Sequence, residues 1–246
     1  MTRAVIIAAL ENEISPLVQD WARSQILIGG KPVPCYESEG VIAVAAGIGA
    51  KRAEAAARIV SAKFKPQMLI SAGLAGALIS SLKVANIVLP NVIVDAESGA
   101  EYRCNVGGEV IGGGVLVTAS QIAGAADKQA LVERFHALIV DMEAAGIAKI
   151  AQESGTGFRC VKAISDELEF VMPPLNEFVN SDGSFDTAAY ARWVSLRPQY
   201  WARTLQLGRN SARAARELCS WLQQNLRSGL RPAKVVTLNE AEYSKH

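Results

Sequence analysis

Val140-Asp141-Met142-Glu143-Ala144-Ala145-Gly146 is the stretch that decides the fold, together with its companion Lys162-Ala163-Ile164-Ser165-Asp166-Glu167. Each belongs to a short apolar run, residues 137–140 or 158–164, that stops abruptly in acidic residues. We interpret both runs as strands of an α/β sheet, because buried strands are short and continuously apolar. Ligands of α/β proteins bind outside the carboxyl ends of the strands. We therefore expect Glu143 and Asp166 to serve one pocket.

A third carboxylate, Glu13, follows the first apolar run of the chain, residues 4–10, in the same way. Three carboxylates at three strand ends suit acid/base chemistry. A structural reading stands beside this one, since an acidic residue behind a strand often caps the next helix or favours its dipole. Position alone leaves both readings open.

The remaining sequence alternates between strand and helix patterns. The long apolar run at 86–96 contains Pro90, which predicts a bulge or a sheet edge there. Strands alternating with helices favour a three-layer αβα architecture, and we expect one domain over residues 1–246. The further strands are expected at 25–28, 33–38, 41–46, 68–72 and 115–118, and the helices from residue 14, at 51–62, at 125–135, after Met142 to about 153, and within 187–227.

Composition narrows the functional classes. The formal net charge is +1 and half of the residues are hydrophobic, so nothing in the overall charge indicates a nucleic-acid partner. The N-terminus runs straight into a strand without a signal-peptide pattern, and no apolar run approaches the roughly 20 residues that span a bilayer. The four cysteines lack any metal-ligand spacing. We expect a cytoplasmic protein with no integral membrane segment, metal or cofactor.

Five segments, in their order along the chain, resemble one family: the superfamily of purine nucleoside phosphorylases and methylthioadenosine/S-adenosylhomocysteine nucleosidases. The resemblance spans about residues 4–166, and its last two segments, one helix apart, carry most of it. It implies a mixed, twisted central sheet flanked by helices, cleavage of a purine N-glycosidic bond, and a homodimer. The five segments are Ala8-Ala9-Leu10-Glu11-Asn12-Glu13, Gly47-Ile48-Gly49, Ala72-Gly73-Leu74-Ala75-Gly76, Asp141-Met142-Glu143-Ala144-Ala145 and Ala163-Ile164-Ser165-Asp166.

The resemblance implies a role for each acidic residue. Asp166 is similar to the general acid that protonates the imidazole ring of the departing purine, and Ser165 to the neighbour that holds its carboxyl group. Glu143 corresponds to the ligand of the ribose hydroxyls, and Met142 to the apolar face against the sugar. Glu13 corresponds to the residue that takes a proton from the attacking water.

These roles agree with the charges that develop during the reaction. Breaking the bond between an anomeric carbon and nitrogen builds positive charge on the sugar and negative charge on the base. A proton donor at the base and a carboxylate near the ribose oppose the two charges. Two carboxylates also divide the work in glycoside hydrolysis.

Two positions of the purine and ribose site are less typical of the family. The tight turn at Gly73 predicts a close approach of backbone to substrate, but Leu74 stands where the well-known nucleosidases carry a hydroxyl residue. The position that stacks on the purine is not aromatic, and Ile122 is the substitute that we assign to it.

Water is the favoured nucleophile. A phosphorylase holds phosphate with backbone N–H groups and arginines. Here Glu11 and Glu13 follow the first strand and would repel phosphate, and no arginine follows before Arg23. A phosphorylase remains the alternative, because Lys51 and Arg52 follow the turn at 47–49 and could support an anion.

The C-terminal half suggests the substituent and a second functional class. The apolar loop at 170–175 resembles a subgroup that includes nucleosidases proposed to act on adenosylhopane. It suits an apolar group on the ribose 5′ position, and it suits a lid or a subunit contact equally well. Arg209, Arg213 and Arg216 lie on one predicted helix face. That face is either a solvated surface or, on a catalytically inactive scaffold, a binding surface for anionic membranes or nucleic acids.

Overall fold

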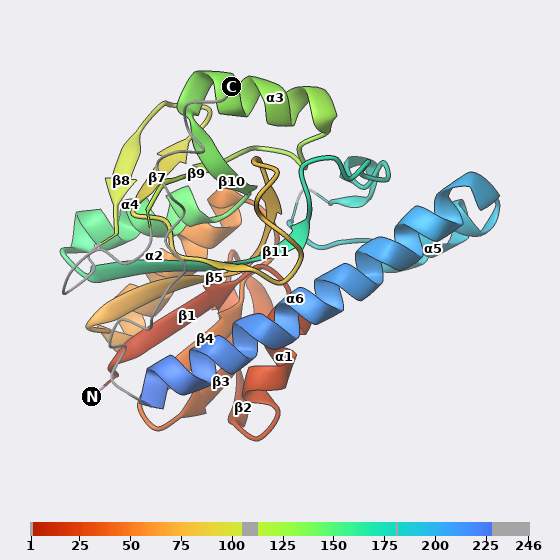
Figure 1. Cartoon of the computed structure of the whole chain (residues 1–246). Coiled ribbons are helices and arrows are strands. Elements are labelled where there is room, and N and C mark those ends of the chain that lie inside the picture. The colour runs from red at the N-terminus through yellow and green to blue at the C-terminus, as the bar shows by residue number, and fades with distance from the viewer. Residues whose placement is uncertain (1, 105–112, 181, 228–246) are drawn as a thin grey trace.

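The computed structural model describes residues 2–104, 113–180 and 182–227, and its described strands form one mixed sheet (Figure 1). The sheet order is β2-β3-β4-β1-β5-β10-β9-β7-β8, and β11 pairs with both β5 and β6. The expected mixed central sheet is confirmed. The strands are β1 (Ala4–Ala8), β2 (Ala22–Ile28), β3 (Lys31–Ser38), β4 (Val41–Ala45), β5 (Met68–Ala77), β6 (Ile87–Val88), β7 (Val92–Asp95), β8 (Glu101–Arg103), β9 (Val115–Thr118), β10 (Ala137–Asp141) and β11 (Gly157–Asp166).

Helices cover both faces of the sheet (Figure 1). α2 and α4 pack together on one face, and α1 and α6 on the other, while α3 lies against β9 and β10. The alternation of a strand explains both cores: Val5 and Ile7 of β1 face the first layer, and Ile6 faces the second. The helices are α1 (Glu11–Val18), α2 (Ala50–Phe64), α3 (Ala125–Phe135), α4 (Ala144–Ser154), α5 (Thr187–Ser195) and α6 (Trp201–Arg227), with 3₁₀ turns η1 (Asn176–Phe178) and η2 (Pro198–Tyr200).

The long strand β5 organises the sheet around the carboxyl ends of its neighbours. Its first half lies between β1 and β11, both parallel to it. At its last residues β10, which runs antiparallel, takes the place of β1, while β11 stays paired as far as Gly76. β5 therefore brings the ends of β1, β10 and β11 to one place, although these strands are far apart in sequence.

Three expectations about elements need correction. The run at 86–96 forms two strands, β6 and β7, separated at Pro90, which has no N–H for a ladder. The first helix begins at Glu11 rather than at residue 14, with Pro16 inside it. The helical pattern at 187–227 is divided into α5, η2 and α6.

The apolar side chains of α6 are buried only in its C-terminal part. Leu218 and Leu222 are fully buried against the sheet, whereas Trp201 and Leu205 are exposed. The reason is visible in Figure 1, where the first turns of α6 extend beyond the edge of the sheet together with α5. Within the described residues, no helix has the length and apolar character required to cross a bilayer.

Candidate active site

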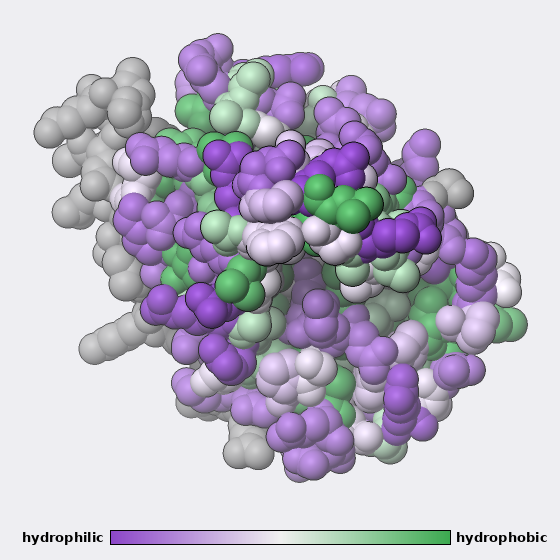
Figure 2. Space-filling view, turned by 90° about the vertical axis from the view of Figure 1, so that its right-hand side faces the viewer, coloured by the Kyte–Doolittle hydropathy of each residue, from purple (hydrophilic) through white to green (hydrophobic). Residues whose placement is uncertain are grey.

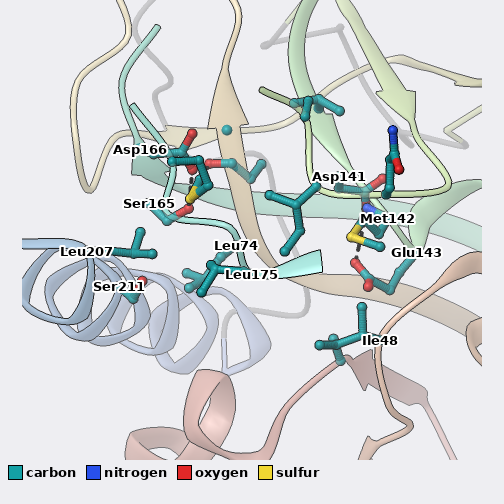
Figure 3. A pocket seen from close by; sticks show the side chains of 18 of the residues that line it. Ile48, Leu74, Asp141, Met142, Glu143, Ser165, Asp166, Leu175, Leu207 and Ser211 are labelled. Atoms are coloured by element: carbon teal, nitrogen blue, oxygen red, sulfur yellow. Dashed lines mark hydrogen bonds between the residues drawn. The ribbon is translucent and has the colours of Figure 1, made fainter. Parts of the chain in front are cut away.

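A pocket lies at the meeting point of the β1, β5, β10 and β11 ends. Of the seven predicted site residues, six line it and Gly73 does not. Figure 3 shows Ser165 and Asp166 on one side of the pocket and Met142 and Glu143 on the other. Its lining comprises Ala9, Leu10, Glu13, Ile48, Leu74, Ala75, Gly76, Gln121, Ile122, Ala123, Lys128, Val140, Asp141, Met142, Glu143, Ser165, Asp166, Met172, Leu175, Leu207 and Ser211.

The Asp166 carboxylate is buried at the end of β11 and accepts from two side chains. Ser165 Oγ donates to Oδ1 at 2.8 Å, as the resemblance implied for this neighbour. Lys128 Nζ, from α3, donates to Oδ2 at 2.7 Å and to the Glu167 carbonyl at 3.0 Å. The side chains of Lys128 and Asp166 are 2% and 5% exposed, so this ion pair is shielded from water.

Two glycines of β5 make room for carboxylates. A Cβ on Gly76 would lie 2.9 Å from Asp166 Oδ2, and a Cβ on Gly73 would lie 3.3 Å from Glu13 Oε2. Real Cβ atoms essentially never approach as closely as the first of these distances. The close approach expected at Gly73 therefore involves the protein's own Glu13, and the neighbouring Leu74, Ala75 and Gly76 line the pocket.

Glu13 is held by main-chain N–H groups at the start of α1. Its Oε2 accepts from Ala9 N at 3.0 Å and Leu10 N at 3.1 Å, and its Oε1 accepts from Leu74 N at 3.4 Å. The capping role and the pocket position thus coexist. Burial raises the pKa of Glu13, while these N–H groups and the positive charge of Lys162 oppose the increase.

Glu143 projects into the opposite side of the pocket. Its Oε1 accepts from Gly49 N at 3.0 Å, which connects the turn at 47–49 to the end of β10. The pKa of Glu143 is raised to about 7, mainly by burial and also by the negative charges of Asp141 and Glu13, while the positive charge of Lys162 opposes the increase. A carboxyl group with this pKa changes its charge near neutral pH.

Behind Glu143 lies a second buried ion pair. Lys162 Nζ is 2.7 Å from Asp141 Oδ2, and both side chains are at most 1% exposed. Asp141 also accepts from Thr118 Oγ1 at 2.7 Å and from Ala144 N, the first main-chain N–H of α4, at 2.9 Å. Asp141 is thereby fully occupied by structural contacts. The positive charge of Lys162 lowers the pKa of both Glu13 and Glu143.

The remaining walls are apolar and come from distant segments. Asn176 of η1 fixes the main chain of Ile122: its Oδ1 accepts from Ile122 N at 2.9 Å and its Nδ2 donates to Ile122 O at 3.1 Å. Met172 and Leu175, from the loop after β11, and Leu207, from α6, complete the lining. The site thus has charged ends and an apolar wall.

Arg52, which the sequence left open as an anion ligand, is engaged elsewhere. Its Nε donates to Ala46 O at 3.1 Å and its Nη1 to Ile28 O at 3.2 Å. It does not line the pocket, and neither does Lys51, whose side chain is exposed. The guanidinium group fastens β2 and the turn after β4 to α2.

Sequence reasoning missed the two lysines of the site. Lys162 lies within the apolar run of β11 and is fully buried. A lysine inside a buried strand could have indicated a buried ion pair, because lysines are rarely fully buried without a partner. Lys128 lies in an ordinary amphipathic helix pattern, and nothing in its surroundings marked it.

Comparisons with known proteins agree with this geometry. Residues 104–189 match the family model described as "Phosphorylase superfamily". The 5′-methylthioadenosine/S-adenosylhomocysteine nucleosidase of Oceanobacillus iheyensis is 26% identical over 196 residues, which cover 65% of this chain and 84% of that protein. The enzyme of the same name from Geobacillus thermodenitrificans is 26% identical over 197 residues, covering 67% and 84%.

Solved structures show the same fold. The nucleosidase of Neisseria meningitidis in complex with methylthio-immucillin-A superposes with a TM-score of 0.70 at 17% identity, covering 93% of this chain and 100% of that chain. Futalosine hydrolase of Helicobacter pylori gives a TM-score of 0.69 at 17% identity, covering 93% and 99%. The resemblance inferred from the sequence motifs is confirmed.

Proposed function

We propose, on the premise of this resemblance to the phosphorylase superfamily and its nucleosidases, that the chain hydrolyses the N-glycosidic bond of a 5′-modified adenosine. The observation that carries the proposal is the arrangement of Glu13, Glu143 and Asp166 around one pocket. Methylthioadenosine and S-adenosylhomocysteine, named for the relatives, are the first substrates to test.

In the proposed reaction, the bond between the anomeric carbon and the purine nitrogen breaks, and its electron pair moves into the base. Asp166 passes to the imidazole ring of the base the proton that it shares with the Lys128 ammonium group, which becomes a neutral amine, and Ser165 holds the Asp166 carboxyl group. Lys128 adds a second proton-bearing group at 2.7 Å from Asp166, next to the leaving group. Glu143 binds the ribose hydroxyls, and its negative charge opposes the positive charge on the sugar.

Water is the proposed nucleophile, and Glu13 takes its proton. Burial raises the pKa of Glu13, so its carboxylate is a stronger base than an exposed one. A phosphate at this position would face two carboxylates, and the candidate anion ligand Arg52 donates to main-chain carbonyls. These contacts support hydrolysis over the phosphorylase alternative.

The apolar wall supports an apolar 5′-substituent. Met172, Leu175 and Leu207 line the pocket without a charged side chain among them. An alkylthio group, or a bulkier hydrocarbon such as that of adenosylhopane, suits this wall better than a zwitterionic amino acid does. We further propose that residues 1–246 act as one domain and that the protein works as a cytoplasmic homodimer.

The test is the release of free adenine from methylthioadenosine in phosphate-free buffer, with the adenine measured by chromatography. We expect Asp166→Asn and Glu13→Gln each to lower kcat by about 10²–10⁴-fold, the usual contribution of a proton-transfer group. Asp20→Asn is a matched control, because Asp20 is exposed and does not line the pocket. Circular dichroism of each variant establishes that it is folded.

Two results would overturn the proposal. Purine release that requires phosphate would establish a phosphorylase. No release from any 5′-modified adenosine, with or without phosphate, would favour the inactive scaffold.

A further inference from the structure

The segment formed by α5, η2 and the first turns of α6 projects from the body of the protein (Figure 1). An aromatic cluster packs at its base, with the centroids of contacting rings 4.9–6.5 Å apart. Trp201 Nε1 also donates to Val194 O at 2.8 Å, which joins α6 to α5. We call residues 187–216 the basic arm. The aromatic cluster consists of Tyr190, Trp193 and Tyr200 of the arm and of Phe178 and Phe185, which precede it.

The basic arm exposes large apolar side chains. The side chains of Leu196, Trp201 and Leu205 are 77%, 53% and 55% exposed. Large apolar side chains are usually buried in the core, so their exposure together in one segment is unusual. Trp201 and Leu205 are four residues apart in α6 and therefore share one face of the helix. Figure 2, which looks onto the projecting side, shows apolar side chains directly beside strongly hydrophilic ones.

The charge of the basic arm is entirely positive. Six arginines and no acidic residue lie between Thr187 and Arg216, in a chain whose formal net charge is only +1. No ion pair forms with any of the six in the described part of the chain. Arg209 follows Leu205 by four residues, so the apolar face continues into an exposed cationic one. The six are Arg192, Arg197, Arg203, Arg209, Arg213 and Arg216.

We propose that the basic arm docks on an anionic membrane surface. Tryptophan and leucine insert at the level of the lipid headgroups, and arginines bind the phosphates. Each basic residue near such a surface strengthens the attraction, and the attraction weakens as salt increases. A second copy would bring two like-charged arms together, and a nucleic acid would leave the exposed leucines without a partner. Anionic lipid satisfies both kinds of side chain.

The proposed docking surface, formed by Trp201, Leu205 and Arg209, lies next to the pocket but contributes none of its charged side chains. Leu207 and Ser211 of α6 line the pocket, whereas Trp201, Leu205 and Arg209 do not. Docking therefore places the apolar wall of the pocket near the lipid, and the surface can be altered while the carboxylates stay intact. The proposal stands on the arm alone and does not require the proposed reaction.

The test is co-sedimentation of the full chain with vesicles of phosphatidylglycerol and phosphatidylcholine, against vesicles of phosphatidylcholine alone. We expect binding to the anionic vesicles that is at least about tenfold stronger and that weakens as salt increases. The double variants Trp201→Ser/Leu205→Ser and Arg209→Glu/Arg213→Glu should each lose at least about tenfold in vesicle affinity. Matched controls are Leu27→Ser, at an exposed leucine on β2, and Arg103→Glu, at an exposed arginine on β8.

Equal affinity for both vesicle types, or no binding, would overturn the proposal. So would a Trp201→Ser/Leu205→Ser variant that binds like the unaltered chain. If that variant instead converts a dimer into a monomer by light scattering, the surface is an interface between copies. Salt-sensitive binding of single-stranded DNA or RNA without vesicle binding would assign it to nucleic acid. Purine release from methylthioadenosine is measured in parallel, so a failed reaction is distinguished from failed docking.

Discussion

Lys128 and Asp166 form an ion pair in which Nζ lies 2.7 Å from Oδ2, and both side chains are almost completely buried. The pair joins α3 to the end of β11 across 38 residues of sequence. Because its two charges cancel, a carboxylate can be held beside an apolar pocket with a proton-bearing group next to it. Removal of one partner leaves the other charged and without compensation.

We expect Lys128→Met to lower the free energy of unfolding by about 3–5 kcal/mol, the usual cost of breaking a buried pair. Asp166→Asn should also destabilise. The double variant Lys128→Met/Asp166→Asn should lose less than the sum of the two, because no buried charge remains. Urea unfolding at pH 7 measures all three.

Lys83 provides the control for this cycle. Its ion pair with Glu167 lies at the surface, with side chains 61% and 42% exposed, so Lys83→Met should change the free energy of unfolding by less than about 1 kcal/mol. Additive losses in the double variant would show that Lys128 and Asp166 do not depend on each other.

Gly76→Ala should reduce adenine release more strongly than it reduces stability. The new methyl group would lie 2.9 Å from Asp166 Oδ2 and 3.3 Å from Val140 Cγ1, so it displaces the carboxylate that we assign as general acid. A misplacement of about 1 Å costs on the order of 10²-fold in rate. Steady-state kinetics with methylthioadenosine measures the effect.

Gly208→Ala is the matched glycine control. Nothing lies within 4 Å of an added Cβ at this position in α6. Alanine should therefore raise the free energy of unfolding by about 0.5–1 kcal/mol, because glycine weakens a helix interior. If Gly76→Ala and Gly208→Ala gave the same rate of release, the tight contact at Gly76 would have no functional importance.

The sequence predicted the sheet and the convergence of the carboxylates for a physical reason. The apolar runs indicate buried strands, and the acidic residues that follow them, Glu13, Glu143 and Asp166, indicate where each strand ends at the crevice. A close approach was expected at Gly73, but a sequence does not tell which group approaches, and the turn expected there is wrong because β5 runs through Gly73 to Ala77. Gly73 and Gly76 accommodate Glu13 and Asp166 from two other segments.

The partners of these carboxylates were not predictable in the same way. Lys128 reaches Asp166 only because α3 packs over β9 and β10, and this packing depends on the whole sheet. The exposure of Trp201 and Leu205 has a similar cause: their spacing indicates an apolar helix face, but the place where α6 leaves the sheet decides what that face contacts.

Glu143 should make stability depend on pH near neutrality. Its pKa is raised from 4.5 to about 7, so between these values the folded chain keeps a proton that the unfolded chain has released. Its contribution to stability is therefore present at low pH and is lost as the pH rises through about 7. At 1.36 kcal/mol per pKa unit, the loss of stability by pH 8 is on the order of 3 kcal/mol.

Glu143→Gln keeps an acceptor for Gly49 N and removes the titration. Relative to the unaltered chain, the variant should gain stability at pH 8 and little at pH 5, measured by urea unfolding without substrate. Glu153→Gln, at an exposed glutamate of α4, is the control. A gain of equal size at both pH values would show that the charge of Glu143 is not the cause.

The apolar wall should decide which 5′-substituents are accepted. Leu175→Asp places a charge beside Met172 and Leu207, where a hydrocarbon chain attached to the ribose would lie in the proposed complex. We expect kcat/KM for butylthioadenosine to fall by about 10–200-fold, as for the loss of a few apolar contacts, and kcat/KM for unsubstituted adenosine to change little. The ratio of the two values separates the effect of the apolar wall from that of the carboxylates, because both substrates use the carboxylates.

Leu196→Asp, at an exposed leucine outside the pocket, is the control and should leave this ratio unchanged. Equal losses for both substrates in Leu175→Asp would show that this wall contacts the base or ribose instead of the substituent.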